Sequence, residues 1–303
     1  MDVSWIDTTE ALAAWVDAVG SGPLAVDTEA DSFHHYREKV CLVQLSAGGR
    51  HALVDPLAPI DLTALKAPLA DRSVRKILHG ADYDIRLLGR DFGFSVLAFS
   101  DTMIAARLLG EPAVGLAAML AAHLGVTLDK AHQKADWSKR PMPAAMRVYA
   151  VEDTRHLEAL ALRLEERLEA SGRTGWLREE CERLESVRWR DRRDDEPETF
   201  RRTKGAAALG RDELAVLREL WAWRDATART RDKPLFRILR DETLIALVAA
   251  APSSVDELAR VSGISDAFVR TSAANEVVLA VARGVSCPEA ERPEIRVAFF
   301  DSK

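Results

Sequence analysis

The chain has 303 residues with 42 Lys and Arg against 48 Asp and Glu, a formal net charge of −6, and 48% of its residues are hydrophobic. This composition is a poor fit for intrinsic disorder, for collagen and for a coiled coil. No run approaches the ~20 apolar residues of a membrane helix, and the first residues do not resemble a signal peptide. We therefore expect a cytoplasmic protein of two domains that does not contact a membrane.

The three cysteines lie far apart in the sequence, at Cys41, Cys181 and Cys287. Their spacing favours neither a disulfide framework nor a zinc site of paired cysteines. We interpret them as reduced, structural residues.

The negative charge is concentrated in the first half of the chain, where residues 1–172 carry 18 basic and 24 acidic side chains. A negative domain argues against long-range attraction of a polyanion. However, a divalent metal site requires concentrated carboxylates, and bound ions invert the local field. The charge balance therefore leaves nucleic-acid binding open.

An antiparallel meander is predicted near the N-terminus. Apolar and alternating residues indicate three strands there, and a turn signal separates the last two. The strands are expected at 24–30, 41–46 and 51–55, and the turn at 47–50.

Strands and helices then alternate, which is typical of an α/β layer. They are predicted as a helix at 62–70, a strand at 74–80, a helix at 83–93, a strand at 95–101 and a helix at 102–110. The fold class predicted for this part is α/β, with a mixed five-stranded sheet and helices. Asp101 is expected to cap the helix that begins at Thr102.

Helical patterns dominate the rest of the chain. One helix is expected at 116–125, and a long one from Ala144 to Ala170 with Pro143 at its start and Gly172 after its end. The charged segment 173–204 is interpreted as a helical arm followed by a linker. Residues 205–285 are predicted to form a small all-α domain of about five short helices, with breaks at Pro and Gly residues. The proposed division is thus 1–172, 173–204, 205–285 and a tail at 286–303.

Carboxylates gather at the ends of the predicted strands. Asp27 and Glu29 share one face of a strand end because strand side chains alternate. Further acids occur in the strand-to-helix junction that carries Asp82 and Asp84. On the long helix, four residues separate Tyr149 from Asp153, so both lie on one helical face.

These oxygen donors suit hard divalent cations. Mg²⁺ and Mn²⁺ prefer oxygen ligands, and two such ions ~4 Å apart can hold the attacking and leaving oxygens of a phosphoryl displacement. A neutral phenol can position the attacking water. Each motif alone is common, and their order on these elements makes the combination specific.

The combination resembles the DEDD superfamily of 3′-to-5′ exonucleases, in the tyrosine-bearing branch that contains ribonuclease D and the nuclear-exosome exonuclease subunit. This family has a ribonuclease H-like fold. The matching segments, within residues 24–160, are VDTEADSF, ILHGADYDIRLLGRDFG and KAHQKADWSKRPMPAAMRVYAVEDTRHL.

The resemblance implies roles for five residues. The four metal-binding acids are Asp27, Glu29, Asp84 and Asp153, and Tyr149 orients the nucleophilic water. The choice of Asp84 over Asp82 rests on the family spacing. If both are helical they point in different directions, so at most one faces the metals. The implied cofactor is a pair of divalent ions, Mg²⁺ or Mn²⁺.

Four further residues are predicted to bind substrate: Thr28, His79, Lys130 and Gln133. The segment from Lys130 to Pro141 is similar to the family stretch that borders the 3′-terminal nucleotides. The alternative for Lys130 is a solvated loop lysine. The alternative for His79, inside an apolar strand end, is a hydrogen-bonded core histidine.

The second domain is similar to the HRDC domain of ribonuclease D and RecQ helicases. The resemblance rests on the break at Arg231, Asp232 and Pro234 and on the helix start at Asp241-Glu242. A candidate phosphate-contacting patch, with a solvated face as the alternative, consists of Arg224, Arg229, Arg231, Lys233, Arg237 and Arg240.

The leading functional hypothesis is a metal-dependent exoribonuclease that releases nucleoside 5′-monophosphates from the 3′ ends of tRNA precursors or other structured RNAs. The partner implied is an RNA 3′ end, with single-stranded DNA as an alternative. Two other functions are weighed: a DNA 3′ exonuclease of the Werner type, and an inactive module that binds nucleic acid or partners.

Overall fold

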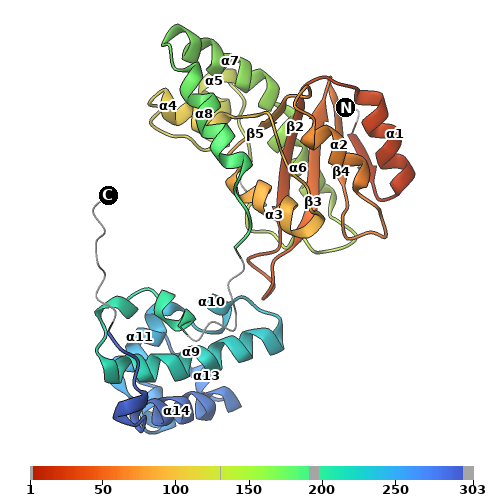
Figure 1. Cartoon of the computed structure of the whole chain (residues 1–303). Coiled ribbons are helices and arrows are strands. Elements are labelled where there is room, and N and C mark those ends of the chain that lie inside the picture. The colour runs from red at the N-terminus through yellow and green to blue at the C-terminus, as the bar shows by residue number, and fades with distance from the viewer. Residues whose placement is uncertain (1–2, 130, 191–197, 296–303) are drawn as a thin grey trace. The chain divides into compact units, whose positions relative to one another are not determined.

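The computed structural model describes residues 3–129, 131–190 and 198–295. The chain divides into two units, the first formed by residues 1–33 and 38–190 and the second by 34–37 and 191–303. Figure 1 shows the strands and helices of the first unit and the helices of the second. Each unit has its own hydrophobic core. The predicted class, an α/β domain followed by an all-α domain, is confirmed.

The first unit is built on a mixed sheet of six strands in the order β1-β4-β3-β2-β5-β6. The strands are β1 (Val3–Ile6), β2 (Leu24–Ala30), β3 (Val40–Ala47), β4 (Arg50–Val54), β5 (Lys76–Leu78) and β6 (Phe99–Asp101). The prediction of five strands missed β1, which lies at the sheet edge and pairs in parallel with β4. The predicted antiparallel meander of β2, β3 and β4 is confirmed.

The pairing of β5 determines what lies beside β2. Strand β5 pairs in parallel with Leu24 and Ala25 of β2, and β5 ends at Leu78. The chain then turns into helix α3, so the first turn of this helix approaches the later part of β2. That part carries Asp27 and Glu29.

Helices cover both faces of the sheet. They are α1 (Thr9–Val19), α2 (Lys66–Ala70), α3 (Asp82–Phe92), α4 (Thr102–Leu108), α5 (Leu116–Leu124), α6 (Ala144–Arg155), α7 (Leu157–Ala170) and α8 (Thr174–Glu185). The prediction of one helix from Ala144 to Ala170 is wrong, because the chain breaks at His156. The two halves pack on different partners: α6 contacts β2, β3 and β4, whereas α7 contacts α4, α5 and β5.

Asp101 caps α4, as predicted, by accepting hydrogen bonds from the backbone N–H groups of Met103 (2.8 Å) and Ile104 (3.2 Å). Its carboxylate also accepts from the N–H groups of Gly80 and Ala81, at 3.0 and 2.8 Å. One buried carboxylate therefore holds both the start of α4 and the turn that leads into α3.

The helical arm predicted in 173–204 corresponds to α8, which buries Leu177 and Cys181 in the core of the first unit. Residues 191–197 of the predicted linker lie outside the described residues. The proposed division of the chain into four parts remains a prediction.

The described part of the second unit contains six α-helices. They are α9 (Arg211–Arg231), α10 (Leu235–Ile238), α11 (Asp241–Ala250), α12 (Val255–Leu258), α13 (Asp266–Val269) and α14 (Ser272–Val285). Helix α14 ends at Val285, next to Gly284, one of the glycines near which a break is predicted. A Cβ atom there would come within 2.4 Å of Cα of Val216 on α9, so glycine permits the close approach of the two helices.

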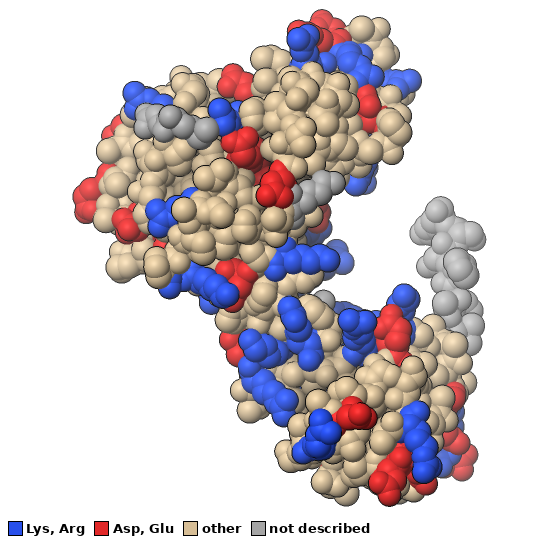
Figure 2. All heavy atoms as spheres, turned by 180° about the vertical axis from the view of Figure 1, so that it is seen from behind, with Lys and Arg blue, Asp and Glu red and all other residues tan. Residues whose placement is uncertain are grey.

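The six-residue basic patch predicted for this unit is corrected at one position. Arg224 is buried, and its guanidinium donates to Asp241 at 2.7 Å and to the carbonyl of Leu239. Because its side chain is buried and hydrogen-bonded in the core, its guanidinium cannot contact phosphate. The other five residues, Arg229, Arg231, Lys233, Arg237 and Arg240, are exposed. Figure 2 shows basic side chains gathered over part of the visible face of this unit.

Among the described residues, no helix is long and apolar enough to cross a membrane. All three cysteines are buried and free of disulfide bonds, as predicted.

Candidate active site

Two of the predicted acids lie on one face of β2. Side chains alternate along a strand, so Asp27 and Glu29 share the face of Ala25, whereas Thr28 points to the opposite face with Val26. Ala25 packs with Leu157 and Ala161 of α7. The carboxylates of Asp27 and Glu29 therefore lie on the face of the sheet that α7 covers.

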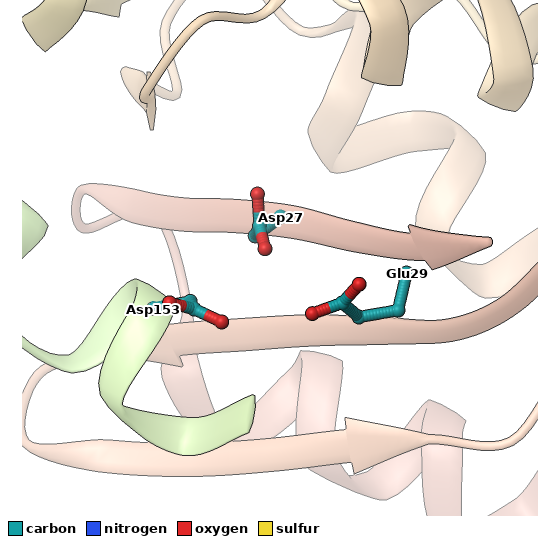
Figure 3. Close-up of side chains that lie close together, drawn as sticks. All are labelled: Asp27, Glu29 and Asp153. Carbon is teal, nitrogen blue, oxygen red and sulfur yellow. The ribbon is translucent and has the colours of Figure 1, made fainter. Parts of the chain in front are cut away.

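Helix α6 brings the third acid to this face. Oxygen atoms of Asp27, Glu29 and Asp153 all lie within 4.8 Å of one another. Figure 3 shows the three side chains pointing toward the space between β2 and α6. Residues far apart in the sequence thus form one acidic cluster, which contains three of the four acids of the predicted site.

The cluster is electrostatically unfavourable on its own. Burial, followed by the charges of Asp153 and Asp84, raises the pKa of Glu29 from 4.5 to about 9. Burial and then the charges of Asp84, Asp153 and Glu29 raise the pKa of Asp27 well above its usual range. The pKa of Asp153 rises to about 7, mainly through burial and then through Glu152. Such a site favours either protons or a cation.

Asp84 lies beside this cluster and is held from the opposite face of β2. Its Oδ1 atom accepts a 2.5 Å hydrogen bond from the hydroxyl of Thr28. Asp84 is buried, whereas Asp82 is exposed and forms an ion pair with Arg86 at 2.8 Å. The geometry therefore separates the two candidates, although Asp84 is not within the 4.8 Å group.

Tyr149 faces the same acids from α6. Burial, followed by the charges of Asp153, Glu29 and Asp27, raises the pKa of its phenol. The hydroxyl is therefore protonated at neutral pH. Its ring lies near those of Trp137 and His132, with centroid distances of 6.0 and 5.7 Å.

A cavity of about 290 Å³ opens next to Tyr149 and Asp153. Its wall includes three residues that the motif analysis did not single out: Asp129, His132 and Glu152. Asp129 adjoins the predicted residue Lys130 and Glu152 adjoins Asp153. Both residues are adjacent in sequence to a predicted site residue, and this adjacency could have pointed to them. Helical periodicity, however, did not predict that Glu152 lies at the site.

The other predicted substrate-binding residues occupy different surroundings. Nδ1 of His79 lies 2.8 Å from Oγ1 of Thr102, and burial lowers the pKa of this histidine. Gln133 is exposed on the loop between α5 and α6. Lys130 lies outside the described residues. The substrate-binding roles of all four, Thr28 included, remain predictions.

The acidic cluster fits a hard divalent cation. Oxygen ligands on opposite sides of one Mg²⁺ ion are about 4.2 Å apart, because each lies about 2.1 Å from the ion. The 4.8 Å limit on the oxygens of Asp27, Glu29 and Asp153 is compatible with a shared ion. Such an ion also offsets the repulsion that raises their pKa values.

Comparison with protein-family models identifies both parts of the chain. A model described as 3′-5′ exonuclease matches residues 3–169, and the HRDC domain model matches residues 213–281. The chain is 35% identical to the ribonuclease D of Gluconacetobacter diazotrophicus over 292 residues, which cover 95% of this chain and 73% of that protein.

The chain belongs to the ribonuclease D family.

Solved structures agree with membership of the ribonuclease D family. The structure of Escherichia coli RNase D, described as an exoribonuclease involved in structured RNA processing, matches with a TM-score of 0.75 and 31% identity, covering 98% of this chain and 79% of that one. The catalytic core of RRP6 from Trypanosoma brucei matches with a TM-score of 0.77 and 29% identity, covering 93% and 79%. Membership assigns the chain to the hydrolytic 3′-to-5′ exoribonucleases, a metal-dependent class.

Proposed function

We propose that this chain removes nucleotides one at a time from the 3′ ends of structured RNAs such as tRNA precursors, releasing nucleoside 5′-monophosphates. The observation that carries the proposal is the acidic cluster of Asp27, Glu29 and Asp153, with Asp84 and Tyr149 beside it. The involvement of E. coli RNase D in structured RNA processing supports the substrate class.

The four acids are proposed to hold two divalent cations, Mg²⁺ or Mn²⁺. The cluster of Asp27, Glu29 and Asp153 suits one ion. Asp84, whose charge acts on both Asp27 and Glu29, is proposed to contribute to a second. When bound, such ions neutralise the phosphate and lower the pKa of an attacking water. Cations also allow the negative first domain to accept an anionic strand.

Tyr149 is proposed to orient the attacking water. Its phenol is neutral at pH 7, so it can accept one hydrogen bond and donate another at the edge of the acidic cluster. A neutral group suits positioning, whereas a phenolate would add to the negative charge already gathered there. The adjacent cavity, about 290 Å³, offers room for the end of a substrate strand.

The second unit is proposed to assist RNA binding through the exposed members of its basic patch, Arg229, Arg231, Lys233, Arg237 and Arg240. The cytoplasm is the proposed compartment, and three buried free cysteines are compatible with it.

A degradation assay on matched ends tests the function. RNA and DNA strands of one sequence, each labelled at the 5′ end, are incubated with the protein and Mn²⁺ or Mg²⁺, with EDTA as the control. We expect stepwise shortening of the RNA, appearance of nucleoside 5′-monophosphates and no reaction in EDTA. Faster shortening of the DNA would favour the Werner-type alternative, and shortening of neither strand would favour the inactive binding module.

A further inference from the structure

Arg140 ties the loop between α5 and α6 to the sheet of the first unit. Its guanidinium forms a bidentate ion pair with Asp55 at the end of β4, with Nε–Oδ2 and Nη2–Oδ1 distances of 2.7 and 2.6 Å. The side chain of Asp55 is 7% exposed. Two parallel bonds from a planar guanidinium fix direction as well as distance, and lysine cannot reproduce them.

The same guanidinium also holds three backbone carbonyls. Nη2 donates to the carbonyl of Cys41 at 2.6 Å, and Nη1 donates to those of Trp137 and Lys139, each at 2.8 Å. Cys41 belongs to β3, whereas the other two residues belong to the loop. Arg140 therefore joins β3, the end of β4 and the loop through a single group.

The loop that Arg140 holds supports Tyr149. Trp137 is 1% exposed and packs in a cluster with Met146 and Ala150 of α6. Its ring lies 6.0 Å from that of Tyr149, tilted by 41°. The carbonyl of this same tryptophan accepts a hydrogen bond from Arg140. The position of the Tyr149 ring thus depends on a residue whose backbone Arg140 fixes.

We propose that Arg140, through its pair with Asp55, is a positioning residue for Tyr149. It acts on the nuclease reaction without contacting the phosphate, by keeping Trp137 seated against the tyrosine ring. This role rests on the proposed function of Tyr149 in orienting water. Misplacing a reacting group by about 1 Å costs as much as about 100-fold in rate, so the effect belongs in kcat.

Kinetics of Arg140→Lys and the nearly isosteric Asp55→Asn test the role. Each is expected to lower kcat by about 10- to 100-fold with KM changed less than about 3-fold. Arg72→Lys is the matched control, because Arg72 forms a similar two-bond pair with Glu185 away from the loop, and its kcat should be unchanged. Wild-type kcat in folded Arg140→Lys overturns the proposal, as does a loss confined to KM, which would make Arg140 a substrate-binding residue.

A double-mutant cycle with Tyr149→Phe identifies the route of the effect. If Arg140 acts through the tyrosine, Arg140→Lys should change the single-turnover rate of the Tyr149→Phe enzyme by less than about 3-fold. Losses that multiply would show that Arg140 acts independently of Tyr149 and would overturn the proposal.

Limited trypsin digestion provides a readout that needs no activity. Cleavage after Lys134, inside the loop, should be at least about 10-fold faster in Arg140→Lys and Asp55→Asn than in the wild type and Arg72→Lys, because cleavage follows the population of opened loop. Unchanged cleavage would contradict the proposed restraint even if the wild type shortened no RNA. An inactive wild type with the expected cleavage pattern would instead reject the proposed function alone.

Discussion

The hydroxyl of Thr28 on β2 donates a 2.5 Å hydrogen bond to Oδ1 of Asp84 on α3, across 56 positions of sequence. Thr28 points to the face of the strand opposite Asp27 and Glu29. One strand thus presents two acids directly and holds a third through the residue between them. The charge of Asp84, which accepts this bond, contributes to the raised pKa values of Asp27 and Glu29.

Replacing Thr28 tests this relationship. Thr28→Val keeps the shape of the buried side chain but removes the hydroxyl, so Asp84 loses its restraint, and we expect nuclease kcat to fall about 10-fold or more. Thr28→Ser keeps the donor and should remain within about 3-fold of the wild type. Steady-state kinetics of both variants provide the measurement. Equal activity of Thr28→Val and Thr28→Ser would show that the reaction does not need the hydrogen bond to Asp84.

The pKa shifts predict an unusual dependence of stability on pH in the metal-free protein. The folded-state pKa values of Glu29 (about 9), Asp84 and Asp153 (both about 7) are raised, so the folded protein retains protons that the unfolded chain releases. The free energy of unfolding therefore falls as pH rises from about 4 to about 9. Since one pKa unit corresponds to about 1.4 kcal/mol, we expect a loss of at least that size.

Urea unfolding in EDTA at pH 5 and pH 8 measures this loss. Glu29→Gln should flatten the dependence by removing one titrating carboxylate. Mn²⁺ should stabilise the wild type more at pH 8 than at pH 5, because it competes with protons for the same oxygens. A metal-free protein that becomes more stable over this range would refute the electrostatic account of the site.

Gly284→Ala is expected to destabilise the second unit. The new Cβ atom would lie 2.4 Å from Cα of Val216 and 2.9 Å from its nitrogen, and these backbone atoms of α9 cannot yield without separating the helices. The cost should be at least about 1–3 kcal/mol. Val285→Ala, at an exposed neighbour in the same helix, is the control. Thermal unfolding followed by circular dichroism should show a lower midpoint for Gly284→Ala alone.

The sequence predicted those features that local patterns determine. The strand carrying Asp27 and Glu29 has the bounds expected from its alternation, and Asp101 caps α4 because a capping carboxylate needs only its neighbours. The spacing of Tyr149 and Asp153 placed both on one helix face, which the structure confirms at the acidic cluster.

Features that depend on distant partners could not be predicted in this way. The strand β1 is four residues long and exists through its pairing with β4. The break at His156 reflects two different packing surfaces, and the burial of Arg224 reflects its pair with Asp241. Periodicity could not choose between Asp82 and Asp84, because the hydrogen bond that holds Asp84 comes from Thr28 on β2, a tertiary contact.

The most direct test of the account compares nucleotide release from an RNA 3′ end by Asp27→Asn and Asp82→Asn. Asp27 belongs to the acidic cluster, whereas Asp82 is an exposed acid paired with Arg86. We predict that Asp27→Asn lowers the rate by about 1,000-fold or more, since metal-ion catalysis is worth several kcal/mol, and that Asp82→Asn retains the wild-type rate. Wild-type activity in Asp27→Asn would contradict the assignment of the cluster as the metal-binding centre.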